Sequence, residues 1–261
     1  MTTGYAPLFF EETMPARLRL GVLTPSSNTV LEPLTQSMLA RLPGVTAHFS
    51  RFPVTEISLR TEALMQFKLE PILQAAQLLA DARVDVIGWS GTAAGWMGFD
   101  ADEVLCRAIT ERTGIAATSS VLALNDMLAS QGITRLGLVS PYVPEVQERI
   151  AANYGHIGVE CVAERHLDLS VNYAFAEVGE AQLLQMIGEV AQVQPQAITT
   201  FCTNLQAAAL AERVEAELGI PLLDTVSAAV WGMLNKAGAD TAAIQGWGQM
   251  FGWRSRQNRG L

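Results

Sequence analysis

Apolar runs and amphipathic stretches alternate along most of the chain. The segments "RLGVLTP" at 19–25 and "VDVIGWSGTAAG" at 84–95 begin as apolar runs and end in small or polar residues, which is typical of a buried strand that enters a turn. Between such runs, apolar residues recur at helical spacing in 69–83, 100–114, 145–155 and 180–193. This alternation predicts an α/β protein in which helices cover both faces of a parallel sheet.

The same pattern occurs twice in the chain. Three pairs of segments recur in the same order: 19–25 with 135–141, 84–95 with 195–206, and 114–128 with 219–234. Repetition of several segments in one order is stronger evidence for a tandem repeat than any single short match. The sequence therefore predicts two similar Rossmann-like halves. In this alignment Gly91 occupies the position that Cys202 has in the second half.

The repeat divides the chain into an N-terminal half, 17–128, and a C-terminal half, 129–228. We expect the segment 229–261 to complete the first half, and a pseudo-two-fold axis to relate the two halves. Ligands of parallel sheets bind at the carboxyl ends of strands, where loops and helix N-termini present unpaired N–H groups. We therefore expect one active site between the halves, surrounded by four strand-end residues: Pro25, Gly91, Pro141 and Cys202.

Composition and charge argue against several classes of function. The 261 residues are 49% apolar and 16% charged, which is enough for a sizeable core. A net charge of −9 argues against a nucleic-acid partner, whose binding requires clustered Lys and Arg. The chain shows no secretory signal and no run near the roughly 20 apolar residues that span a membrane. We expect a cytoplasmic protein without a membrane partner and leave a homo-oligomer open.

The cysteines and histidines do not suggest a metal site or a disulfide framework. Cys106, Cys161 and Cys202 have no CxxC spacing, and the three histidines are scattered and separated from the strand ends. We therefore expect reduced thiols and no metal. The C-terminal stretch "WRSRQNRGL" is basic, but its weak periodicity is more typical of a loose tail than of a binding arm.

Cys202 is the main candidate for chemistry, because it follows the apolar run "AITTF" and precedes a stretch of helical periodicity. A helix N-terminus lowers the pKa of a thiol and supplies oxyanion donors, which favours proton transfer or attack on carbon. The alternative is a small buried hydrophobe, the usual fate of a free cysteine. Its place at a strand end favours the functional interpretation. Cys106 and Cys161 lie in a helical pattern and a short strand, and we interpret both as core residues.

Polar residues follow the first strand of each half. In "TPSSNTVLEP", Ser26 and Ser27 are expected to be helix N-caps, whereas the amide of Asn28 can either cap a helix or bind a substrate carboxylate. Tyr142 is the equivalent of Ser26 in the second half. It is either a surface tyrosine or a phenol that donates to an anion in the cleft.

The run "SGTAAG" brings Gly91, Thr92 and Ala93 to the end of another strand. The simpler interpretation is a tight turn of small residues. The alternative is that the lack of side-chain bulk lets backbone N–H groups approach a bound carboxylate.

These residues resemble the aspartate/glutamate racemase superfamily, in particular the branch of maleate cis-trans isomerase and arylmalonate decarboxylase. "TPSSNT" resembles the isomerases' "VPSSNT", "SPY" at 140–142 resembles their "APY", and the similarity covers about 17–235. An ectoine-utilisation branch is also similar. The resemblance implies two α/β halves, no cofactor, a small carboxylate or dicarboxylate substrate, and one or two cysteines at equivalent strand ends.

Matched by position, the resemblance assigns roles to individual residues. The second family cysteine falls on Cys202, the shared tyrosine on Tyr142, and the isomerases' substrate-binding asparagines on Asn28 and on Asn172 within "LDLSVNYAFA". Racemases and maleate isomerases have a cysteine at the first strand end, where this chain has Gly91 in a "GT" dipeptide similar to the decarboxylases. Two opposed thiols serve both faces of a carbon, whereas one thiol acts from a single side.

Our leading hypothesis is cofactor-independent decarboxylation of a substituted malonate-type diacid. One carboxylate is held by three donors: Thr92, Tyr142 and Thr203. The other lies against apolar walls, for which Trp89 and Trp96 are candidates, and leaves as CO2. Cys202, with an ordinary thiol pKa of about 8.5, is largely protonated near neutrality and protonates the enediolate on one face.

Two alternatives remain open. The first is a maleate isomerase or an Asp/Glu-type racemase that acts through Cys202, which Asn28 and Asn172 favour as a second polar carboxylate site. The missing first thiol counts against it. The second is a non-catalytic sensor of small anions, which the intact Cys202 counts against.

Overall fold

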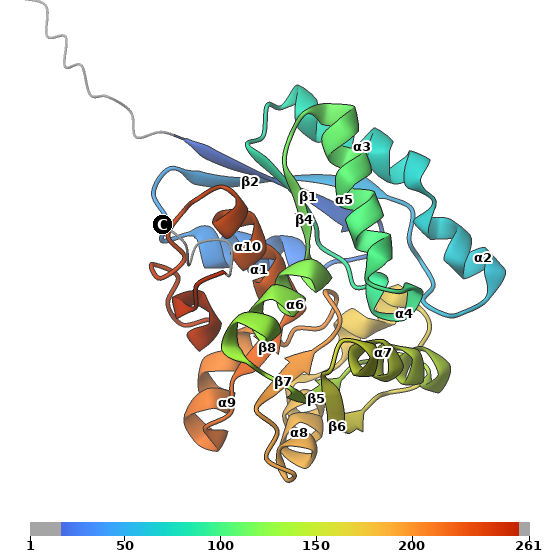
Figure 1. The fold of residues 1–261 in the computed structure, drawn as a ribbon, viewed down its shortest axis with the longest axis vertical. Helices are drawn as coiled ribbons and strands as arrows, with labels where there is room; N and C mark the ends of the chain where they lie inside the picture. Colours follow the sequence, from blue (N-terminus) through green and yellow to red (C-terminus); the bar gives the residue numbers. More distant parts are fainter. Residues whose placement is uncertain (1–16, 256–261) are drawn as a thin grey trace, which may run out of the picture.

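The computed structural model describes residues 17–255 and contains two four-stranded parallel sheets (Figure 1). The first has the order β2-β1-β3-β4: β1 (Leu18–Pro25), β2 (Val45–Phe52), β3 (Val86–Trp89) and β4 (Ala117–Ser119). The second has the order β6-β5-β7-β8: β5 (Arg135–Val139), β6 (Glu160–Arg165), β7 (Ala197–Thr200) and β8 (Leu222–Asp224). The identical order of the two sheets confirms the predicted fold of two similar α/β halves.

The register of the central strands supports the alignment of the repeats. The strand partners are Leu20 with Val86 in the first sheet and Leu136 with Ala197 in the second. These pairs hold equivalent positions of the repeat. Gly91 follows β3 at the same distance as Cys202 follows β7, so the two residues occupy equivalent places in the two halves.

The four helices expected from periodicity are present as α3 (Leu69–Asp81), α5 (Asp100–Thr113), α7 (Pro144–His156) and α8 (Glu180–Ala191). The remaining α-helices are α1 (Leu31–Leu39), α2 (Thr61–Leu64), α4 (Ala94–Met97), α6 (Ser120–Gln131), α9 (Ala211–Leu218) and α10 (Thr225–Lys236). Short 3-10 helices are η1 (Met65–Phe67), η2 (Asn172–Glu177), η3 (Ala208–Leu210) and η4 (Gln249–Gly252). Gly114 and Gly132 adopt the left-handed conformation that ends α5 and α6.

Helices cover both faces of the sheets (Figure 1). In the first half, α3 and α5 pack together on one face, while α1 and α10 contact each other and the strands on the other. In the second half, α8 contacts three strands and packs beside α9, and α7 lies against β6. The strands between these layers are almost entirely buried, because a parallel sheet covered on both faces needs apolar residues on both.

The helices α6 and α10 are equivalent in the two halves and pack against each other. Each begins with a side-chain cap: Ser119 Oγ accepts from the N–H of Leu122, and Asp224 accepts from two N–H groups of α10. A Cβ on Gly232 would lie 2.6 Å from the Cβ of Ala123, so the glycine permits the close approach of the two helices. The helix α10 also contacts β3 and β4 of the first sheet.

Each sheet has an edge strand that is only partly buried and is therefore weakly marked in the sequence: β2 in the first sheet and β6 in the second. The first residues of the basic C-terminal stretch are packed, since Ser255 is buried and the Trp231 indole donates to the carbonyl of Trp253 at 3.2 Å. The rest of the tail, 256–261, and the N-terminal extension, 1–16, lie outside the described residues.

Within residues 17–255, no helix is long and apolar enough to cross a membrane. The same part of the chain contains no group of three or more His, Cys, Asp or Glu side chains arranged to hold a metal ion.

Candidate active site

A small cavity of about 20 Å³ lies between the two halves, at the carboxyl ends of the central strands. Its walls come from both halves: Pro25, Val54, Ile57, Phe67, Trp89, Gly91, Thr92, Ala93, Trp96, Tyr142, Asn172, Cys202 and Thr203. Of the expected strand-end residues, Pro25, Gly91 and Cys202 line the cavity. Pro141 does not line it, but the next residue, Tyr142, does. The repeat therefore brings together residues that are far apart in the sequence.

Two hydroxyl groups from opposite halves form the polar end of the cavity. Thr92 Oγ1 lies 2.7 Å from Tyr142 Oη, and both residues are buried. Burial, followed by the neighbouring Cys202, raises the pKa of Tyr142 well above its ordinary value, so the phenol is neutral. The pair can present hydroxyl hydrogen to an anion without carrying charge. The alternative of a surface tyrosine at position 142 is wrong.

Cys202 is buried beside this pair, with 2% of its surface exposed. Its Sγ accepts from the N–H of Asn204 at 3.4 Å. Burial raises the pKa of Cys202 to about 12, although Tyr142 and the N–H groups of Asn204 and Leu205 act in the opposite direction. The expectation that a helix N-terminus lowers this pKa is wrong, because turns follow Cys202 and the α-helix α9 begins only at Ala211. The thiol is therefore protonated at neutral pH.

Thr203 and Asn28 join the two halves behind the thiol. Thr203 Oγ1 donates to the carbonyl of Ser90 at 3.2 Å and accepts from Asn28 Nδ2 at 3.3 Å. Asn28 Oδ1 accepts from the N–H groups of Val30 and Leu31, so Asn28 acts as the cap of α1. It lies behind Thr203, outside the residues that line the cavity. Substrate binding by Asn28 stays a prediction that would need its second amide hydrogen.

The two serines beside Asn28 are not helix caps, contrary to the expectation from sequence. Ser27 Oγ donates to the carbonyl of Val54 at 2.6 Å, and Ser26 Oγ accepts from the N–H of the same residue at 3.1 Å. They therefore tie the end of β1 to the segment that follows β2.

Asn172 lines the cavity at the start of η2. Its Nδ2 donates to Ser27 Oγ at 2.8 Å, and its backbone N–H donates to the carbonyl of Thr55 at 2.9 Å. Both bonds run from the second half to the first. The side chain is thereby fixed at the edge of the cavity, at the place that the resemblance assigns to a substrate-binding asparagine.

Asn204 also belongs to the site, although it was not predicted from the sequence. Its Oδ1 accepts from the N–H of Thr29 at 3.0 Å, and its Nδ2 donates to the carbonyl of Asn172 at 2.7 Å. Together with the N–H bond to Cys202, these contacts hold the thiol loop against both sides of the cavity. The available signal was an amide residue two positions after a strand-end cysteine.

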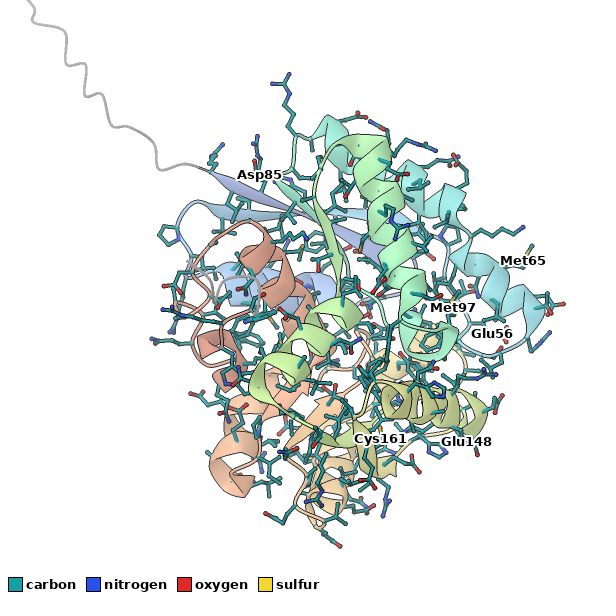
Figure 2. All side chains as sticks on the ribbon, viewed as in Figure 1. Glu56, Met65, Asp85, Met97, Glu148 and Cys161 are labelled. Carbon is teal, nitrogen blue, oxygen red and sulfur yellow. The ribbon has the colours of Figure 1, made fainter. Side chains whose placement is uncertain are left out.

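A segment between β2 and α3 covers the cavity and was also not expected to take part. Val54, Ile57 and Phe67 contribute apolar walls. The segment is held to the second half by an isolated bridge between Glu56 and Val171 and by a bond from the N–H of Ile57 to Ser170. In Figure 2, Glu56 and Met65 lie at the same rim of the molecule as Met97 of α4. We call this stretch, 53–68, the covering segment, because it supplies apolar wall to the cavity.

Gly91 has a steric function in the structure. A Cβ on this residue would overlap the indole of Trp89, and the backbone of Gly91 is not in the left-handed region. The glycine therefore makes room for a buried tryptophan ring in the wall of the cavity. Ala93 is also buried and is the N-cap residue of α4.

The other two cysteines are separated from the site. Cys106 is buried in α5, and Cys161, labelled in Figure 2, is partly buried in β6 of the second half. Burial raises the pKa of each to about 12. Neither residue lines the cavity with Cys202, and the same holds for the three histidines.

The cavity has no formal charge of its own. Among the described residues that line it, there is no Lys, Arg, His, Asp or Glu. An anion bound here is therefore held by neutral hydroxyl, amide and backbone donors, whose strength grows as water is excluded.

Comparisons with known proteins identify the family of the chain. A family model described as arylmalonate decarboxylase matches residues 19–251. The arylmalonate decarboxylase of Bordetella bronchiseptica is 26% identical over 70% of this chain and 78% of its own. The maleate isomerase of Geobacillus stearothermophilus is 23% identical over 87% of this chain and 95% of its own.

Solved structures show the same fold. The maleate cis-trans isomerase of Nocardia farcinica, in a mutant with a covalently bound succinylcysteine intermediate, has a TM-score of 0.83 at 23% identity. The match covers 90% of this chain and 98% of that chain. The chain is therefore an enzyme of the arylmalonate decarboxylase family, in the branch of the aspartate/glutamate racemase superfamily that also holds maleate isomerase.

Proposed function

We propose that this enzyme decarboxylates a substituted malonate-type diacid without a cofactor and protonates the intermediate from Cys202. The observation that carries the proposal is the single protonated thiol among the residues that line the cavity, with a glycine at the equivalent strand end of the other half. A thiol with a pKa of about 12 is an acid and not a nucleophile at neutral pH. One acid on one side of a carbon suits the delivery of one proton to one face.

The reaction divides the substrate between a polar and an apolar part of the cavity. The retained carboxylate accepts from the hydroxyl groups of Thr92, Tyr142 and Thr203, which give up their hydrogen bonds to one another and to the carbonyl of Ser90 to bind it. The departing carboxylate lies against the apolar walls of the covering segment and of Trp89, where weak solvation favours its loss as CO2. The electron pair of the broken C–C bond passes into the retained carboxylate and gives an enediolate, whose negative charge the hydroxyl donors stabilise.

Cys202 then completes the reaction. Its S–H proton passes to the α-carbon, the enediolate returns to a carboxylate, and a thiolate remains. The N–H groups of Asn204 and Leu205 and the phenol of Tyr142 support this thiolate, because each lowers the pKa of Cys202. The thiolate regains a proton from water after the product leaves. The product is formed with one handedness, since the thiol approaches from one side.

A second candidate is a maleate isomerase or racemase reaction through Cys202. Asn172 favours it, because its amide lies in the cavity and offers a site for a second retained carboxylate. The Nocardia farcinica relative carries a covalently bound succinylcysteine, so a cysteine in this branch bonds to carbon. In this chain such an addition requires a thiolate, which burial disfavours. A non-catalytic anion sensor is the third candidate.

A screen of small diacids tests these candidates. Malonates with different substituents, maleate, and amino or hydroxy diacids are incubated with the enzyme in D2O and followed by proton NMR. Decarboxylation gives a monoacid with one deuterium at the α-carbon and one handedness. Conversion of maleate to its trans isomer, or exchange of an α-proton without CO2 loss, supports the second candidate instead. Measurable binding with no product from any compound supports the sensor.

A further inference from the structure

The indole N–H of Trp96 is buried in the wall of the cavity without a hydrogen-bond partner among the described residues. The side chain as a whole is 4% exposed. A buried donor left unpaired destabilises a fold, and buried tryptophan N–H groups usually find an acceptor. This N–H therefore marks a place where an acceptor is expected.

The indole is held firmly in this position. Its ring meets the edge of Tyr142 at a centroid distance of 5.3 Å and an interplanar angle of 69°, and Phe67 at 6.0 Å and 72° on another side. The short helix α4 that carries it is tied to the second half, because Asn153 Nδ2 donates to the carbonyl of Gly95 at 2.9 Å. A Cβ on Gly95 would overlap Phe201, so this helix also packs closely against the core.

The other donors in the cavity already have partners within the protein. Thr92 and Tyr142 share a hydrogen bond, Thr203 donates to Ser90, and Asn172 donates to Ser27. Of the described residues with an unpartnered buried polar atom, Trp96 is the one that lines this cavity. A ligand bound in the cavity can supply its acceptor.

We propose that Trp96 determines substrate specificity by donating its N–H to an oxygen acceptor on the α-substituent of the substrate. The assignment rests on the proposed decarboxylation. A donor on the departing carboxylate would stabilise its charge and oppose the loss of CO2, and the retained carboxylate already has three hydroxyl donors. The remaining oxygen of a bound substrate lies on its substituent. The preferred substrate is then a malonate whose side group carries a carbonyl, carboxylate or ether oxygen, in place of a plain hydrocarbon.

A pair of substrates of nearly equal shape isolates this contact. Acetonylmalonate carries a ketone oxygen where isobutylmalonate carries a methyl group. The wild-type enzyme should have a kcat/KM about tenfold or more higher for acetonylmalonate, the value of one hydrogen bond to a buried donor. Trp96→Phe should bring the ratio close to one by lowering the rate with acetonylmalonate alone. Phe67→Leu alters the shape of the same wall without removing a donor, and should leave the ratio unchanged.

A spectroscopic measurement on the wild-type protein does not depend on the variant folding. The chain has five tryptophans, and their side-chain N–H signals are resolved by ¹⁵N–¹H correlation and assigned by triple-resonance experiments. Acetonylmalonate should move the Trp96 indole signal downfield, whereas isobutylmalonate should not.

The outcomes separate this proposal from the proposed reaction. Release of CO2 with an unchanged ratio in Trp96→Phe and an unmoved indole signal overturns the role of Trp96 and leaves decarboxylation in place. A shifted indole signal with no CO2 from either compound supports the donor and overturns the decarboxylase. Absence of both binding and turnover with both malonates overturns the two together.

Discussion

The hydroxyl of Thr92, which follows β3 of the first half, lies 2.7 Å from the hydroxyl of Tyr142, which follows β5 of the second. The pair shows how the fold makes its site: each half brings one donor on a strand end, and the cavity forms where they meet. Because Tyr142 is kept neutral by burial, the pair acts by hydrogen bonding and not by charge.

Tyr142→Phe should lower kcat/KM by up to about a hundredfold, because the loss of one oxyanion donor costs roughly 3 kcal/mol. The ring remains, so the melting temperature should change little. Tyr154→Phe is the matched control: it removes a buried hydroxyl that has no hydrogen-bond partner within residues 17–255 and does not line the cavity. Equal kinetics of Tyr142→Phe and wild type would place the carboxylate elsewhere.

Cys202→Ala should reduce turnover by at least about a hundredfold with the fold intact, since it removes the proton donor. Cys106→Ala and Cys161→Ala should change stability only, and a loss of rate in either folded variant would identify a different thiol. In the wild type, burial raises the pKa of Cys202 to about 12, so the thiol stays protonated from about pH 7 to about pH 9. If Cys202 acts as an acid, its titration should not change kcat over this range. A nucleophilic thiolate predicts a tenfold rise in kcat for each pH unit over the same range.

Gly91→Cys tests whether the two equivalent strand ends face one reacting carbon. Sequence alone predicts that a second thiol there confers proton exchange on both faces. The structure adds a steric cost, because the new Cβ would overlap Trp89. We expect the single variant to bind substrate poorly, and Gly91→Cys combined with Trp89→Leu to restore room. Racemisation of an added chiral monoacid by the double variant supports opposed thiols. Normal turnover with unchanged product handedness contradicts them, and Trp89→Leu alone is the control.

Asp102 makes stability fall as pH rises. Burial raises the pKa of its carboxyl from 3.8 to about 7, and its Oδ2 lacks a hydrogen-bond partner among the described residues. Between about pH 4 and pH 7 the folded protein keeps a proton that the unfolded chain releases, so the free energy of unfolding declines by about 4 kcal/mol from this group and is level above pH 7. Asp102→Asn should reduce the decline measured in denaturant titrations by the share of this group, whereas Asp81→Asn, on an exposed position of α3, should leave the decline at its wild-type size. The decline that remains in Asp102→Asn comes from Asp224, whose pKa burial raises to about 6.

The kcat/KM should rise with salt concentration, whereas it falls with salt in an enzyme that attracts its substrate by opposite charge. The chain carries a net charge of −9, and the described cavity wall has no cationic side chain to attract a dianion. Screening of the repulsion should raise kcat/KM about twofold or more between low and physiological ionic strength. Measurements with added NaCl, against sucrose as an uncharged control, check this. A fall in kcat/KM with salt would reveal a cationic entrance.

Much of the architecture could be predicted from the sequence, because it depends on local patterns. Helical periodicity identifies α3, α5, α7 and α8, and the repeated segments identify Gly91 as the equivalent of Cys202. The environment of the thiol could not be predicted. Its high pKa results from burial under elements of both halves, and the sequence suggested a helix where turns occur. The structure also adds Asn204 and the covering segment, since their contacts connect positions far apart in the chain.

The pairing of α6 with α10 has a consequence for how the chain folds. Each helix ends the repeat of its own half, and each buries its apolar face against the other, so neither half covers its core alone. Such mutual dependence favours one cooperative unfolding transition in place of two separate ones. Gly232 lies in this seam, where Ala123 leaves no space for a methyl group. The two halves are thus an obligate pair, and severed halves should recover structure only when they are mixed.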